Sequence, residues 1–210
     1  MSMSRIAALD EHLRLRHRRW QNVEDEWVAW VDAAQLRSCD GRIVPQMCHA
    51  SKLPADARLF RANDILLDPD VTAFLHGALG IVDLQARLLL AHDAPALPAY
   101  GACSRDLLVL HSISHEFDPH YLMHWLRHHG RRMWRETHST RLHLPRSALA
   151  RCWLWQPARE LQQILAGYLE MHLAQLARLG GEPLQRLAAA DAFAASAWLA
   201  WDTDWMEEIR

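Results

Sequence analysis

The sequence predicts an all-α protein, an irregular bundle of about seven helices. Half of the 210 residues are apolar, which is enough to build a core without metals or disulfides. Apolar residues recur at helical spacing in several stretches, and Pro, Gly and Asp-Pro steps separate those stretches. We therefore expect a single helical domain over residues 1–210.

The N-terminal part predicts a helical hairpin over residues 1–37. Apolar residues at helical spacing cover 4–20, and Asn22 is a suitable N-cap for a second helix that reaches about Arg37. A loop over 38–54, with a short extended piece at 42–44, follows, because this stretch holds an Asp-Gly step, two prolines and no sustained period. The loop is the expected boundary between the hairpin and the rest of the bundle.

Later start and stop signals predict the remaining helices. Asp68-Pro69 and Asp118-Pro119 combine an N-cap with a proline that loses no helical hydrogen bond. Gly130 and Gly180-Gly181 are suitable helix ends. The helices expected from these signals cover 68–91, 104–117, 118–130, 145–155, 157–179 and 183–210.

The charge balance argues against broad binding to nucleic acid. The net charge is −2 with neutral histidines, whereas nucleic-acid binding usually needs a basic surface. The charge is uneven, since residues 105–160 hold nine Arg against five acids and residues 161–210 hold three Arg against seven acids. This polarity favours docking to other proteins, with the basic run Arg127–Arg135 left as an alternative contact for phosphates.

The helix expected over 118–130 carries three histidines spaced four residues apart, His120, His124 and His128, here called the histidine ladder. At about 100° per residue, the ladder lies opposite Trp125 and its apolar neighbours, which should face the core. We therefore expect the polar face to meet solvent or a partner rather than to line an active site. The partner-binding residues expected here are His120, His124, His128, Arg127 and Arg131.

Tryptophans mark the last predicted helix. The chain holds ten tryptophans, and Trp198, Trp201 and Trp205 form a stripe at helical spacing. The plain interpretation is that this stripe packs onto the chain's own bundle. The alternative is a helix that docks onto a partner, because tryptophan is enriched at interface hot spots.

A second pair of histidines supports an enzyme alternative. His111 and His115 are four residues apart and, with His76 as a distant third ligand, define a metal- or haem-binding site. The order is H-x-x-x-H-E, which is not the arrangement of a metalloprotease. The simpler interpretation, and the one we favour, is that these histidines are hydrogen-bonded at a seam between helices.

Several absences favour a protein without catalysis, cofactor or small-molecule substrate. The sequence has no glycine-rich phosphate loop, no nucleophile elbow and no repeated Glu-x-x-His pair. Its four cysteines form no disulfide or zinc pattern. It has neither an apolar run of about 18 residues nor a leader-like start. These features predict a cytoplasmic protein, peripheral to a membrane-embedded assembly at most.

In composition the chain resembles the YscK-type accessory proteins of bacterial type III secretion, which are small, helical and poor in lysine. The stretches that carry the resemblance are Phe74-Leu75-His76-Gly77-Ala78-Leu79-Gly80 and Asp106-Leu107-Leu108-Val109-Leu110-His111. The resemblance implies a helical adaptor on the cytosolic platform of that system. The leading hypothesis is therefore a non-catalytic adaptor in a bacterial multiprotein assembly, and the alternative is the metal- or haem-binding enzyme.

Overall fold

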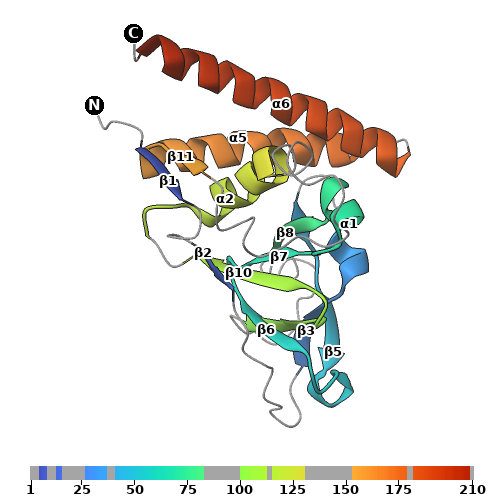
Figure 1. Ribbon diagram of the computed structural model, residues 1–210. Coiled ribbons are helices and arrows are strands. Elements are labelled where there is room, and N and C mark those ends of the chain that lie inside the picture. The colour runs from blue at the N-terminus through green and yellow to red at the C-terminus, as the bar shows by residue number, and fades with distance from the viewer. Residues whose placement is uncertain are drawn as a thin grey trace, which may run out of the picture.

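Two mixed β-sheets, with helices against one side, form the described part of the chain (Figure 1). The computed structural model describes residues 5–8, 13–15, 27–36, 41–82, 100–112, 115–130, 153–178 and 182–208.

The five-stranded sheet, here called the central sheet, is built from strands far apart in the sequence. All neighbours in it are antiparallel except β4 and β8, which run parallel. Its order is β2 (Leu13–Leu15), β10 (Leu108–Ser112), β7 (Ile65–Leu67), β8 (Leu79–Val82) and β4 (Arg42–Ile43).

The four-stranded sheet, here called the outer sheet, contains one parallel pair, β3 with β9. Its order is β5 (Gln46–His49), β3 (Trp27–Val31), β9 (Tyr100–Cys103) and β6 (Arg58–Arg61). A separate ribbon joins two segments nearly 150 residues apart, because β1 (Arg5–Ala8) pairs antiparallel with β11 (Trp153–Gln156).

The helices begin where side chains satisfy free backbone N–H groups. Asp70 accepts from Ala73 N at 2.8 Å, and Asp118 accepts from His120 N at 2.9 Å and Tyr121 N at 3.2 Å. The α-helices are α1 (Val71–Leu75), α2 (Pro119–Trp125), α5 (Arg159–Arg178) and α6 (Pro183–Glu208). The π-helical turn η4 (Leu126–Gly130) follows α2, and the short 3-10 turns are η2 (Ala33–Leu36) and η3 (Ala50–Lys52).

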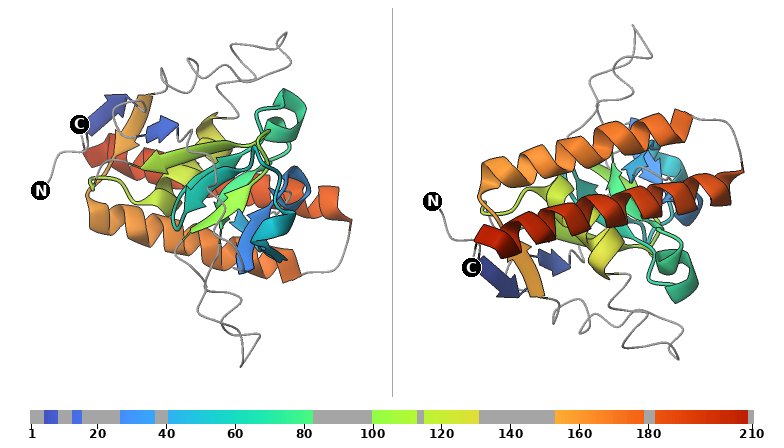
Figure 2. Two further views of the ribbon diagram at one scale, coloured as in Figure 1. Left: turned by 90° about the horizontal axis from the view of Figure 1, so that it is seen from below. Right: turned by 90° about the horizontal axis from the view of Figure 1, so that it is seen from above.

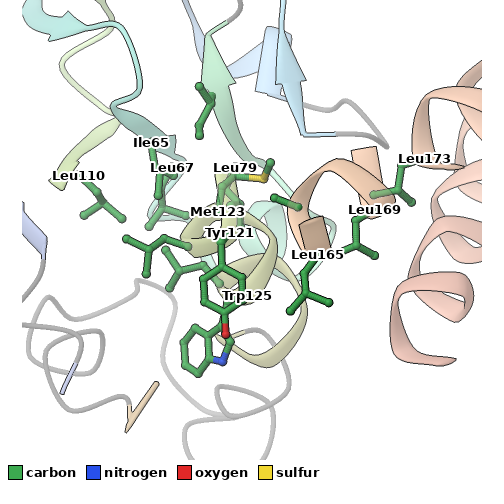
Figure 3. Packing of buried hydrophobic residues seen from close by; sticks show 14 of the residues in the cluster. Ile65, Leu67, Leu79, Leu110, Tyr121, Met123, Trp125, Leu165, Leu169 and Leu173 are labelled. Atoms are coloured by element: carbon green, nitrogen blue, oxygen red, sulfur yellow. The ribbon is translucent and has the colours of Figure 1, made fainter. Parts of the chain in front are cut away.

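Both faces of the central sheet are buried. Ile65 and Leu67 point into a core shared with the helices, whereas Leu66 between them joins a core shared with the outer sheet. Figure 3 shows the helix-side core, where Leu165 and Leu169 of α5 lie beside α2 and the strands. Figure 2 shows α5 and α6 side by side across this face.

Two glycines allow close approach at the β4 edge of the central sheet. A Cβ on Gly80 would lie 2.2 Å from the carbonyl oxygen of Gly41. Gly41 itself has φ of 75°, a conformation that favours glycine, and a Cβ there would lie 2.6 Å from Met123 Sδ. This contact lets α2 pack directly on the sheet edge.

The predicted all-α bundle of seven helices was wrong. The expected helical hairpin over 1–37 contains β1, β2 and β3 among its described residues. In the expected loop over 38–54, β4 confirms the short extended piece, but β5 was not expected. The helix expected over 104–117 is instead strand β10, and the described end of 145–155 lies in β11. Strands β7 and β8 and the first three residues of β10 are short apolar runs buried on both faces, so their spacing does not differ from that of a buried helix.

The helix predictions over 118–130, 157–179 and 183–210 are confirmed by α2 with η4, by α5 and by α6. The helix expected from Asp68 is only five residues long, because Gly77 adopts φ of 79° and strand β8 follows. No described helix has the length and apolarity needed to cross a membrane.

The core between α5 and the central sheet should be sensitive to cavities. Leu169 is 1% exposed, so Leu169→Ala should lower the free energy of unfolding by about 2–5 kcal/mol. Gln163→Ala, on the exposed face of the same helix, should change it by less than about 0.5 kcal/mol. Urea unfolding monitored by circular dichroism measures both, and equal small effects would contradict the described packing.

Candidate functional site

A buried carboxylate organises the turn between β6 and β7. Asp64 is fully buried, and its Oδ2 accepts from Arg61 N at 2.8 Å. Asn63 in the same turn has φ of 68°, which asparagine tolerates better than most residues. Because a buried carboxylate needs hydrogen bonds, Asp64 fixes the turn that presents the exposed Arg61.

The same carboxylate orients a histidine on the central sheet. His111 Nδ1 donates to Asp64 Oδ1 at 2.6 Å, and the His111 side chain is 38% exposed. This hydrogen bond orients the imidazole ring, with Nδ1 toward Asp64 and Nε2 on the other side of the ring. On β2, Arg14 is the register partner of His111.

These residues form one polar edge, here called the Asp64 edge, made of Arg61, Asn63, Asp64 and His111. The chemistry it offers includes hydrogen bonding. Arginine and asparagine side chains read base edges and phosphates in duplex DNA. The edge was missed from the sequence because Asp64 is 47 residues from His111, and only the Asn-Asp turn signal pointed to it.

A second polar cluster joins helix α5 to the central sheet. Glu170 Oε1 accepts from His120 Nδ1 at 2.5 Å, and Glu170 Oε2 accepts from Arg42 Nη2 at 3.1 Å. The cluster, here called the Glu170 joint, therefore links α5, α2 and β4. Glu170 was missed from the sequence, although an acid within an otherwise uncharged stretch was a usable signal.

Hydrogen bonding and burial set the protonation states in the Glu170 joint. The hydrogen bond to Glu170 raises the pKa of His120 above its ordinary value, against the effect of burial. Burial raises the pKa of Glu170, but the hydrogen bond and charge of His120, with further effects of His124 and the hydrogen bond from Arg42, outweigh burial and lower the pKa to about 2. The pair is therefore ionic in mildly acidic solution.

His124 behaves differently, because it is 3% exposed. Burial lowers its pKa to about 3, so it is neutral at neutral pH. Its Nε2 lies 3.9 Å from Glu170 Oε1 and has no hydrogen-bond partner among the described residues. The expectation that the histidine ladder faces outward was therefore wrong for its middle member, because η4 and α5 enclose that side of α2.

The other predicted partner-binding residues are spread over several environments. Arg127 is 5% exposed and lies against Gly41 rather than toward solvent. His120 is engaged by Glu170, and His128 is partly buried with its ring 4.9 Å from that of His129. Arg131 lies outside the described residues.

Trp198 lies in the core. It is 2% exposed, and its ring is 5.7 Å from that of Tyr121 and 5.0 Å from that of His129. This position matches the plain interpretation of the tryptophan stripe for this residue. The side chains of Trp201 and Trp205 lie outside the described part of the chain.

The three histidines of the enzyme alternative have different partners. His111 is held by Asp64, His76 Nδ1 lies 2.7 Å from the carbonyl of Thr72, and the carbonyl of His115 accepts from Arg159. Within the described ranges, no three His, Cys, Asp or Glu side chains gather closely enough to hold a metal ion.

No protein-family model matches the chain, and no curated protein matches it. Among solved structures, the HsdS subunit from Thermoanaerobacter tengcongensis is similar, with a TM-score of 0.60 and 17% identity over 82% of this chain and 43% of HsdS. A chain from a structure of the type I R-M system is similar with a TM-score of 0.53 and 13% identity, over 99% of this chain and 46% of that one. The likeness is one of fold. This chain spans less than half the length of either.

The comparisons overturn the functional hypotheses from the sequence. The neighbours belong to type I restriction–modification systems, so the resemblance to YscK-type proteins and the type III secretion adaptor were wrong. The metal- or haem-binding alternative has no support either. The expectation, drawn from the charge balance, that nucleic acid is an unlikely partner was also wrong.

The Glu170 joint makes stability depend on pH. Because folding raises the pKa of His120, the protonated His120 stabilises the fold. This stabilisation is fully present below pH 6.5, the ordinary pKa of histidine, and is lost as the pH rises through the raised pKa. The lowered pKa of Glu170 stabilises the fold above its ordinary value of 4.5, and this is lost as the pH falls toward 2. Both contributions are present between pH 4.5 and 6.5.

Glu170→Gln should therefore cost about 1–2 kcal/mol of unfolding free energy in that window, allowing for solvent screening at the part-exposed His120. The cost should shrink at higher pH, and the pKa of His120 measured by NMR should fall. Glu160→Gln, exposed on the same helix, is the control and should change neither. A cost that is the same at all pH values would contradict an ionic His120–Glu170 pair.

Proposed function

We propose that this chain is a non-catalytic DNA-recognition module that works with other protein subunits in a restriction–modification assembly, in the cytoplasm. The observation that carries the proposal is the fold shared with the HsdS subunit over 82% of this chain. HsdS is a DNA-recognition subunit without catalysis of its own. A module of this kind needs a surface that reads DNA and a separate surface for its protein partners.

The distribution of charge supports DNA binding by the sheet-containing part. Residues 1–157 hold 19 of the 23 basic and 17 of the 25 acidic residues, whereas residues 158–210 hold the other four basic and eight acidic residues. The part that contains both sheets is thus net positive, and the part that forms α5 and α6 is net negative. Phosphate attraction would orient the module with its helices away from DNA.

The Asp64 edge supplies side chains suited to contact DNA. Arg61 and Asn63 lie exposed in a turn fixed by Asp64, and His111 is held in one orientation beside it. A fixed side chain loses little conformational entropy on binding. We propose that Arg61 and His111 contact DNA, and that Asp64 is a positioning residue.

The basic run proposed from the sequence contributes in part. Arg127 is buried, so it offers no phosphate contact in this structure. Residues 131–152 hold six Arg and one Glu in the sequence, and this composition is suited to contacts with the DNA backbone.

Binding of a labelled duplex of mixed sequence, measured by fluorescence anisotropy between about 50 and 200 mM salt, tests the proposal. The affinity should fall steeply with salt. Arg61→Ala should weaken binding at least about fivefold. If Arg61 contacts a phosphate, the substitution should also reduce the slope of log affinity against log salt concentration by about one.

Arg105→Ala is the matched control. Arg61 pairs with Tyr100 at the start of β9, whereas Arg58 pairs with Cys103 at its end. The exposed Arg105 follows Cys103, so it lies beyond the end of β9 that is far from Arg61. Its charge is also balanced by Asp56 at 2.9 Å. No binding by the parent chain, or equal losses in the two variants, would contradict the proposed interface.

A further inference from the structure

Asn63 lies in the turn between β6 and β7, at a place where the backbone admits few residue types. The turn spans Arg61 to Asp64, and the Asp64 N–H donates to the carbonyl of Arg61 at 3.1 Å. Asn63, its third residue, has φ of 68°, and a positive φ there is typical of a type II turn. Glycine adopts this conformation without steric cost, and asparagine is among the few other residues that tolerate it.

The side chain of Asn63 is presented to the outside of the molecule. Arg61, Ala62 and Asn63 are all exposed, whereas Asp64 is fully buried. Among the described residues, the turn is held by its own backbone and by Asp64 Oδ2, which accepts from Arg61 N at 2.8 Å, and the Asn63 amide takes no part. Since glycine would serve the backbone equally well, what asparagine adds is an exposed amide on a fixed turn.

The surroundings of this amide suit a negatively charged partner such as DNA. Arg61 is exposed two residues before it, and the His111 side chain, 38% exposed, lies beside Asp64. Asp64 is the acid of this edge, but it is buried and its two oxygens face Arg61 N and His111 Nδ1. The small side chain of Ala62 keeps the turn narrow, so it fits the major groove of duplex DNA, which is about 12 Å wide.

We infer that Asn63 recognises an adenine base in the major groove, an inference that rests on the proposed function. A carboxamide carries an acceptor oxygen and a donor nitrogen side by side. Adenine presents the matching pair at the edge of the groove, a donor at N6 and an acceptor at N7. Asn63 Oδ1 then accepts from N6 while Nδ2 donates to N7.

The other bases satisfy only one end of this amide. Guanine has acceptors at both N7 and O6, so one of them would face the amide oxygen. Cytosine offers a donor at N4 alone, and thymine offers an acceptor at O4 alone. Adenine is therefore the base that uses both the oxygen and the nitrogen of Asn63.

Asn63→Gly isolates the amide, because glycine keeps the positive φ of the turn. The parent chain and the variant would each retain duplexes from a randomised pool, and the retained duplexes would be sequenced. The parent should prefer adenine at one position by about five- to a hundredfold, the discrimination expected of a bidentate contact. Asn63→Gly should lose that preference, keep the preferences at the other positions and unfold at a similar urea concentration.

Ala62→Gly is the matched control, since it places a glycine in the same turn without removing a polar group. It should keep the preference for adenine. If Asn63→Gly prefers adenine like the parent, weakens binding to every sequence by the same factor, or behaves like Ala62→Gly, the inference is overturned while DNA recognition stands. A parent that selects no common sequence would overturn both.

An adenine analogue tests the contact to N7. In a duplex of the selected sequence, 7-deazaadenine at the position in question removes the N7 acceptor and keeps the N6 donor. Fluorescence anisotropy should show that the parent binds this duplex at least about threefold more weakly than the adenine duplex, the loss expected for one hydrogen bond. Asn63→Gly should bind the two duplexes equally. A parent that does not distinguish them would overturn the assigned contact.

Discussion

The structure depends on a central sheet that is apolar on both faces. Strands such as Ile65–Leu67 and Leu108–Leu110 alternate between two cores, so each face must be covered. The outer sheet covers one face, and α2, α5 and α6 cover the other. Because water is excluded from both sides, the helices are a structural requirement of the sheet and not a separate unit.

Buried polar groups fix how these layers sit on each other. Glu170 ties α5 to α2 and to β4. Gln162, which is fully buried, donates to the carbonyls of Glu116 and Pro157, both at 2.9 Å, and accepts from Asp118 N at 2.8 Å. Such satisfied polar groups specify one arrangement. The Asp64 edge is fixed in the same way, because one buried carboxylate holds both a turn and a histidine.

The sequence predicted the parts of the fold that depend on local signals. The Asp118-Pro119 start and the long periodic stretches of α5 and α6 were confirmed, because caps and amphipathic spacing act within a few residues. The strands were missed because runs such as Leu79–Val82 are short and uniformly apolar, and their pairing partners lie far along the chain. Asp64 with His111 and Glu170 with His120 were missed for the same reason, since only the tertiary fold brings them together.

Selection from a pool of randomised DNA duplexes tests whether the chain recognises a particular DNA sequence. The purified chain, alone and as the Arg61→Ala variant, would be used to retain DNA at physiological salt, and the retained duplexes would be sequenced. We predict that the parent enriches a short common sequence and that the variant enriches it less or relaxes it at one position. Retained duplexes as random as the starting pool would contradict a recognition module.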